Sequence, residues 1–408
     1  MSTGTVVRPA HQWVMLSGVG ALIFSVVAGG FMLGPLLPDM AQDLGTSIPL
    51  LAQLVTFSAV PWSATGLLVG PLSDIYGRRP LLLLGAALAG AGALGTALSD
   101  SFAVLAGFRI LVGIGSGMIP PTAMALIGDT LPQENKARAT GVFVAMPGAA
   151  NLVGIPLLAV LGDIMGWRTS FVAVGLFMLL SGAAFFVLSP RLPGIRSGSV
   201  GYTVRLRRAL SSRLSLYLLA MAILLQGVYG TLLIFFPPFL REVYGLTASQ
   251  VALPVSIFAV GTIVGGLVGG RVAGHRNRLN RSATILLGIL AFALATFLLE
   301  AGLWPSVAMA AILMLGMRIA FTVMLTLGND AGGQSRGTLM GLLVAGNQGG
   351  IIVGMSLGGL LVAQWGYGRL GFMCGAAVIG ASALFRFALT EKAISLSDEY
   401  FSETATTG

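Results

Sequence analysis

Residues 51–98 decide the fold, and they read LAQLVTFSAVPWSATGLLV, then GPLSDIYGRRP, then LLLLGAALAGAGALGTAL. The two outer runs, Leu51–Val69 and Leu81–Leu98, contain no charged residue. Each is close to the length of about 20 apolar residues that a helix needs to cross a bilayer. The segment between them, Gly70–Pro80, contains one acid and two arginines. Because lipid offers no partner to unpaired backbone groups, this stretch predicts two membrane helices joined by a short basic loop.

Comparable apolar runs recur along the whole chain, which gives twelve predicted membrane helices. They are Trp13–Leu37, Leu51–Val69, Leu81–Leu98, Phe102–Leu126, Thr140–Leu161, Ser170–Leu188, Leu214–Phe236, Val251–Val268, Thr284–Leu299, Pro305–Leu327, Leu339–Val362 and Gly371–Leu389. Of the 408 residues, 56% are hydrophobic and 9% are charged, and the mean hydropathy is +0.91. A soluble domain carries about 25% charged residues. The composition therefore excludes a soluble enzyme and a disordered chain, and it indicates an all-α membrane protein.

The charged residues gather in alternate loops, which predicts the orientation of the chain. One set of loops holds Arg78, Arg79, Lys136, Arg138, Arg271, Arg276, Arg278, Arg281 and Arg336. The other set holds mainly Asp39, Asp43, Asp100, Asp163, Glu242 and Glu300. Lys and Arg are retained on the cytoplasmic side. We therefore expect a multi-pass protein of the bacterial inner membrane with both termini cytoplasmic. The net charge of +9 then reflects topology and lipid contact, with no nucleic-acid partner.

The two halves of the chain repeat each other. Arg138 and Arg336, Gly148 and Gly346, and Trp167 and Trp365 are each 198 residues apart, while Gly70 and Gly270 are 200 apart. Parallel repeats of this kind are typical of membrane transporters with a central site. We predict an N-terminal six-helix bundle at 1–190, a basic cytoplasmic linker at 191–213, and a C-terminal six-helix bundle with a short tail at 214–408.

The loop Gly70–Pro80 resembles the signature G-x-L-x-D-x-x-G-R-R/K of the major facilitator superfamily. Its residues Gly70, Leu72, Asp74, Gly77, Arg78 and Arg79 match that signature. Family members often carry a basic residue at the position of Ile75. The resemblance implies two pseudo-symmetric six-helix bundles. It also implies a secondary transporter that moves a small-molecule substrate by alternating access.

The same resemblance implies a conformational gate at the cytoplasmic ends of the helices. Asp74 should face the start of the eleventh helix, where the helix dipole favours a carboxylate, and Arg78 should reach Asp129 at the end of the fourth helix. The residues assigned to the gate are Gly70, Asp74, Gly77, Arg78, Arg79 and Asp129. The alternative is that Arg78 and Arg79 serve only as topogenic charges.

Two arginines lie clearly within predicted spans, away from the span ends, and a central charge costs about 2.5–3.5 kcal/mol on insertion scales. Arg109 follows Leu105 in LAGFRILVG, which resembles the motif L-x-x-x-R-x-x-Q-G of proton-coupled family members, with Val112 in place of Gln. The resemblance implies a role in coupling or substrate binding, and the alternative is a structural hydrogen-bonding role. Arg318 lies mid-helix in LGMRIA, and no predicted span contains an acid. Its partner is either an anionic or carbonyl-rich substrate or the backbone carbonyls of a broken helix.

Further polar and aromatic residues are candidates for lining a substrate cavity, because amides within hydrocarbon must face protein or water. They are Phe31, Gln53, Trp62, Asn151, Gln226, Tyr229, Asn347 and Gln348. The alternative for each amide is an interhelical hydrogen bond worth about 0.6 kcal/mol, and the alternative for each aromatic ring is packing.

The source of energy is predicted to be an ion or solute gradient. The sequence lacks a nucleotide-binding loop, a metal-ligand cluster and a catalytic elbow, so we expect neither an enzyme nor a cofactor. The candidate residues for proton coupling are Arg109, Asp39 and Asp74. The leading hypothesis is a monomeric antiporter that expels a drug-like compound, sugar or metabolite against inward-moving protons. The alternative is an importer or exchanger of small organic anions that uses Arg109 and Arg318.

Overall fold

The computed structural model describes residues 9–130, 143, 146–188, 212–299, 302–331 and 336–389. Within these ranges the chain is helical apart from short connections, and no strand occurs. The chain divides into two compact units, one of residues 1–198 with 246–256 and the other of residues 199–245 with 257–408. Residues 191–211 of the predicted linker lie outside the described part.

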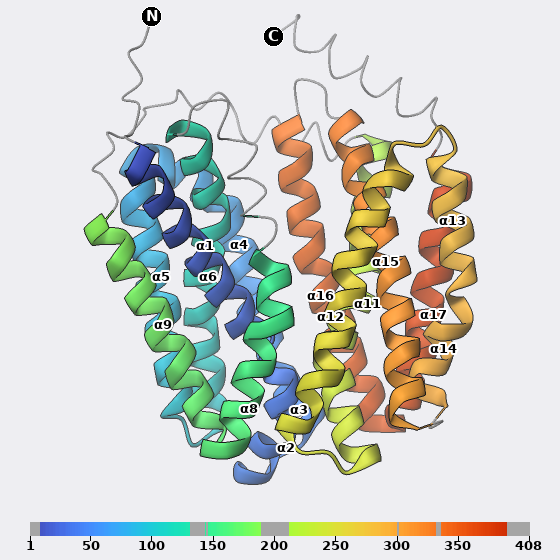
Figure 1. Cartoon of the computed structure of the whole chain (residues 1–408), viewed down its shortest axis with the longest axis horizontal. Coiled ribbons are helices and arrows are strands. Elements are labelled where there is room, and N and C mark those ends of the chain that lie inside the picture. Colours follow the sequence, from blue (N-terminus) through green and yellow to red (C-terminus); the bar gives the residue numbers. More distant parts are fainter. Residues whose placement is uncertain are drawn as a thin grey trace, which may run out of the picture. The chain divides into compact units, whose positions relative to one another are not determined.

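Among its described residues, unit 1 contains six apolar spans when the bent pair α1 and α2 is counted as one. Its helices are labelled in Figure 1. Its elements are α1 (Pro9–Phe31), α2 (Leu33–Asp43), α3 (Ile48–Ala52), α4 (Leu54–Tyr76), α5 (Arg78–Ala97), α6 (Phe102–Thr130), the π-helical turn η1 (Ala150–Gly154), α8 (Ile155–Met165) and α9 (Trp167–Leu188). Helix α6 packs against α4 and α5, and α5 packs against α9. These contacts bury apolar side chains such as Leu82 of α5 and Leu105 of α6.

Unit 2 contains six further spans when α12, most of which belongs to it, is counted there. Its elements are α11 (Arg213–Tyr244), α12 (Ala248–Ala273), α13 (Arg278–Gly288), α14 (Leu290–Leu298), α15 (Leu303–Ala331), α16 (Arg336–Trp365), α17 (Gly368–Ala383) and the π-helical turn η3 (Leu384–Ala388). Helix α11 packs against α15, α16 and α17. Its rings Phe236 and Phe239 lie 6.1 Å and 5.3 Å from the ring of Phe297. The core of this unit therefore centres on α11.

The expected number of membrane spans is confirmed. Eleven described helices are long and apolar enough to cross a bilayer, and the pair α1 and α2 supplies a twelfth as one span bent by 45°. The sequence predicted a single helix over Trp13–Leu37, whereas the structure breaks it at Met32. Pro35 explains the break, because it has no N–H to donate to the carbonyl of Phe31 one turn earlier.

Glycines in the left-handed region end the helices at matching places in the two halves. Gly45 and Gly245 have φ values of 59° and 66°, and Gly166 and Gly366 have φ values of 88° and 76°. Each pair is 200 residues apart, which agrees with the internal repeat in the sequence. Only glycine adopts these φ values without steric cost, so the repeat extends to the backbone geometry of the loops.

Candidate functional site

Arg109 is sealed inside unit 1. Only 1% of its surface is exposed. Its Nη1 donates to the carbonyl of Gly29 over 3.4 Å, and its guanidinium carbon lies 5.7 Å from the centroid of the Phe171 ring. Nε and Nη2 have no hydrogen-bond partner among the described residues. Gly29 lies one turn before the break at Met32, so Arg109 ties α6 to the bent first span.

Arg318 has a different environment in unit 2. Its guanidinium carbon lies 3.9 Å from the centroid of Tyr229 and 5.2 Å from that of Phe321, and the side chain is half-buried. Its buried Nε has no hydrogen-bond partner, and no carboxylate pairs with it, within the part of the chain that the structure describes. A guanidinium over aromatic faces is held by cation–π attraction. That attraction leaves its in-plane N–H donors free to bind an oxygen-rich ligand.

Close packing of two helices sets the position of Arg318. A Cβ at Gly265 of α12 would lie 2.8 Å from the Arg318 Cβ and 2.5 Å from the carbonyl oxygen of Leu315. Helices α12 and α15 therefore touch at this level only because Gly265 has no side chain. The Arg318 carbonyl accepts a hydrogen bond of 2.9 Å from the Thr322 hydroxyl, which adds a local bond on the same face.

The other candidates in unit 2 lie on α11 and α16, which pack closely. Gln226 and Tyr229 of α11 are buried, with 8% and 6% of their surfaces exposed. Asn347 and Gln348 of α16 are half-buried, and the buried Oδ1 of Asn347 has no hydrogen-bond partner among the described residues. In the structure, Tyr229 therefore contacts Arg318. The three amide side chains, Gln226, Asn347 and Gln348, lie on two neighbouring helices of the same unit.

The candidates in unit 1 lie on α1, α2, the second span and the π-helical turn η1. Gln53 accepts a long hydrogen bond of 3.5 Å from the hydroxyl of Thr56, three residues later. Trp62 packs close to the first span, because a Cβ at Gly30 would lie 3.7 Å from its ring. Asn151 is buried in the π-helical turn η1. Phe31 is half-buried at the end of α1, and Asp39 is half-buried on α2.

The predicted gate is described only in part. Gly77, with φ of 90°, separates α4 from α5. Arg78 donates to the hydroxyl of Ser73, and Arg79 donates to the carbonyl of Phe186 with its guanidinium carbon 4.6 Å from the Phe186 ring. The side chains of Asp74 and Asp129 and the surroundings of Gly70 lie outside the described part. The proposed contacts of Asp74 and Arg78 with other helices therefore stay predictions.

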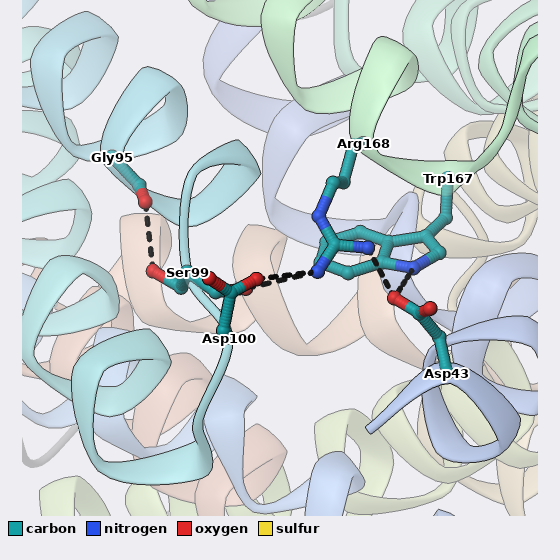
Figure 2. A network of polar contacts seen from close by, with 6 residues as sticks. All are labelled: Asp43, Gly95, Ser99, Asp100, Trp167 and Arg168. Atoms are coloured by element: carbon teal, nitrogen blue, oxygen red, sulfur yellow. Dashed lines mark hydrogen bonds and ion pairs between the residues drawn. The ribbon is translucent and has the colours of Figure 1, made fainter.

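One polar network was missed by sequence reasoning (Figure 2). Arg168 of α9 forms ion pairs with Asp43 at the end of α2 and with Asp100, the latter at 3.0 Å. The indole Nε1 of Trp167 also donates to Asp43 over 3.1 Å. The same Arg168 reaches the carbonyl of Ser99 at 3.3 Å. This network ties three loop segments of unit 1 together. The signal in the sequence is a cation beside an aromatic residue in a set of loops that is mainly acidic.

Comparison with known proteins gives the family. A family model described as Major Facilitator Superfamily matches residues 19–331. The uncharacterized MFS-type transporters YceJ and YwfA of Bacillus subtilis (strain 168) are each 26% identical to this chain. The alignments cover 86% and 94% of this chain and 88% and 94% of theirs. The multidrug transporter protein MdtP of the same organism is 27% identical over 36% of this chain and 27% of its own.

Solved structures agree on the fold. A D-xylose-proton symporter superposes with a TM-score of 0.73 at 14% identity, covering 93% of this chain and 98% of that one. A bacterial homolog of the human lysosomal transporter Spinster, in an inward-facing and unoccupied conformation, gives a TM-score of 0.71 at 18% identity, covering 97% and 98%. With up to twelve apolar spans among the described residues and a matching family model, the chain is a multi-pass membrane transporter, not an enzyme. It belongs to the Major Facilitator Superfamily.

Proposed function

We propose that this transporter expels a small organic solute in exchange for inward-moving protons, by alternating access between its two repeated units. The likeness to a multidrug transporter over part of the chain supports export of a drug-like compound, sugar or metabolite. A ligand drives such a cycle only if it binds the inward-facing and outward-facing states with different affinities. The site must therefore contain a group whose surroundings differ between those states.

This proposal rests on the surroundings of Arg318. This arginine is an intramembrane cation, held against Tyr229 and Phe321, to which the described residues offer no carboxylate. The guanidinium can bind a carbonyl, carboxylate or phosphate oxygen through its fork of N–H groups. The flanking rings can stack on an aromatic or apolar body. We therefore assign to this site an organic solute that combines a ring or apolar skeleton with an oxygen acceptor.

Carboxylates at the ends of spans would supply proton coupling. None of the twelve apolar runs contains Asp or Glu, whereas Asp39 and Asp74 lie at the ends of the first two. A carboxylate that is protonated in one state and ionised in the other links the gate to the proton gradient. Arg109, which holds α6 to Gly29 of the bent first span, would transmit that change within unit 1.

The orientation follows from the loops. The loop after the second span carries Arg78 and Arg79, and the loop after the eighth carries Arg276 and neighbouring arginines. Both loops follow an even number of crossings, so they lie on the same side of the membrane as the N-terminus. The positive-inside rule assigns that side to the cytoplasm. We propose location in the inner membrane with both termini cytoplasmic.

Transport in proteoliposomes tests the proposal. A pH gradient should drive accumulation of an organic dye, and collapse of the gradient with a protonophore should stop it. Arg318→Gln should lower the rate at least about tenfold, because a charged hydrogen bond is worth about 1.5–3 kcal/mol. Arg318→Lys should recover only part of it, because lysine keeps the charge and loses the planar fork. Undiminished transport by Arg318→Gln would contradict the assignment of substrate binding to Arg318. Transport at the same rate with and without the pH gradient would contradict proton coupling.

The second candidate function is exchange of small organic anions, which the uncompensated charge of Arg318 favours. The anionic dye fluorescein and the cationic dye ethidium distinguish the two functions in counterflow assays. If Arg318→Gln abolishes counterflow of fluorescein and leaves ethidium counterflow intact, anion exchange replaces drug efflux as the function. If both dyes lose transport equally, Arg318 serves a general solute site.

A further inference from the structure

A hollow of about 480 Å³ lies in unit 2, at the end of α13 that follows the basic loop. Six of the residues that line it are Asn280, Thr284 and Leu287 of α13, Ile379 of α17, and Arg386 and Phe387 of η3. We call it the α13–α17 hollow. The Ser382 hydroxyl donates to the Ala283 carbonyl over 3.0 Å and joins α17 to α13 beside it. Neither the substrate site nor the gate described above uses these residues.

The polar end of the hollow carries positive charge. Nη1 of Arg386 donates to Oδ1 of Asn280 over 2.7 Å, which uses one of the five N–H groups of the guanidinium. Arg281 is the next residue along α13, and the sequence contains no acid in 271–299 or in 368–389. Asn280 also belongs to the first turn of α13, where the helix dipole favours an anion. A negatively charged group fits this end.

The other end of the hollow is apolar and exposed. Leu287 and Ile379 have 55% and 51% of their surfaces exposed, and each belongs to a membrane span. Asn280, Thr284 and Leu287 follow one another at spacings of four and three, so they share one face of α13. That face changes from polar to apolar as the helix enters the bilayer. A phospholipid has the same order, with a phosphate at the surface and an acyl chain below it.

We propose that the α13–α17 hollow binds an anionic phospholipid. Arg386 and the amide nitrogen of Asn280 contact the phosphate, and the acyl chain lies along Leu287 and Ile379. Free phosphate would satisfy the same polar groups, but it has no acyl chain to contact the apolar residues of the hollow. Anionic lipids are also concentrated at the surface that basic juxtamembrane segments contact.

Native mass spectrometry of the full-length protein tests this site. Delipidated protein is titrated with phosphatidylglycerol and with phosphatidylcholine of identical acyl chains. Phosphatidylglycerol should bind more tightly, and Arg386→Gln should weaken that binding about tenfold. Arg369→Gln is the matched control. Arg369 is an exposed arginine at the other end of the same span, with its guanidinium carbon 5.7 Å from the Phe372 ring, and its loss should leave the binding unchanged.

A second variant tests the shape of the hollow separately from its charge. Thr284→Trp fills the hollow without altering any charge, and it should weaken phosphatidylglycerol binding as well. Equal affinity for the two lipids, or unchanged phosphatidylglycerol binding by both Arg386→Gln and Thr284→Trp, overturns the proposal. Displacement of the lipid by inorganic phosphate at low millimolar concentration overturns it too, because the site would then be one for free phosphate.

Discussion

Substitution of Gly265 by alanine should push α12 away from α15 and displace Arg318. The new Cβ would lie 2.5 Å from the Leu315 carbonyl oxygen, whereas ordinary van der Waals contact begins at 3.4 Å. The two helices must therefore separate by about 0.9 Å at this level. The nearest atom belongs to the backbone, so a change of rotamer cannot relieve the clash. Overpacking of this kind costs about 1–3 kcal/mol.

Gly266 provides the matched control for this substitution. It is the next residue of the same helix, and a Cβ there would meet nothing within 4 Å. Alanine stabilises a helix relative to glycine by about 1 kcal/mol, and this gain applies to both positions. The difference between Gly265→Ala and Gly266→Ala therefore isolates the steric effect on α15.

Thermal unfolding of the purified variants and transport in proteoliposomes measure the effect. Gly265→Ala should unfold at a lower temperature than Gly266→Ala and should raise the substrate KM, because the Arg318 guanidinium shifts from its position 3.9 Å above the Tyr229 ring. Gly266→Ala should transport like the natural protein. Equal stability and equal KM for the two variants would refute the close contact of α12 with α15 and the placement of Arg318 derived from it.

Three further predictions concern other parts of the chain. Asp43→Asn should lower the free energy of unfolding by up to about 1 kcal/mol, and by more than Asp100→Asn does. The reason is that Asp43 accepts hydrogen bonds from Arg168 and from the Trp167 indole, whereas the Asp100 side chain is 89% exposed. A lower melting temperature for Asp100→Asn than for Asp43→Asn would contradict this. Asp74→Ala should abolish transport while expression stays normal, and full transport would refute the gate. Cys374 has no exposed surface, so the folded protein should resist maleimide. Rapid labelling of the native protein would contradict that burial.

The sequence predicted the spans well because the bilayer imposes one simple requirement on them. A run such as Leu81–Leu98 has a single stable conformation in lipid, and the structure has a helix at Arg78–Ala97. The prediction was weaker where backbone geometry depends on a single residue. Pro35 lies within the predicted helix Trp13–Leu37, and its missing N–H breaks that helix at Met32. Counting apolar residues gives no information about such a break.

Polar contacts between distant segments were harder to predict. The sequence shows Arg168 beside Trp167, but it cannot show that Asp43, 125 residues earlier, lies against both. By contrast, Arg109 and Arg318 were identified from the sequence alone, since any charge within an apolar run needs an explanation. The sequence alone did not decide whether a ligand or the protein itself binds each guanidinium. That depends on which rings and carbonyl groups the fold brings close to the two arginines.

The structure separates the roles of these two arginines. Arg109 is 1% exposed and bonds to the carbonyl of Gly29, so a solute cannot reach its guanidinium unless α1 and α6 move apart. Arg318 is half-buried and bound mainly through the faces of two rings, so its N–H groups can meet a solute while those rings stay in place. Substitution of Arg109 should therefore reduce stability and transport together, whereas substitution of Arg318 should alter substrate affinity with little loss of stability. The repeat in the sequence does not make the two arginines equivalent, because they are 209 residues apart while the halves repeat at about 200.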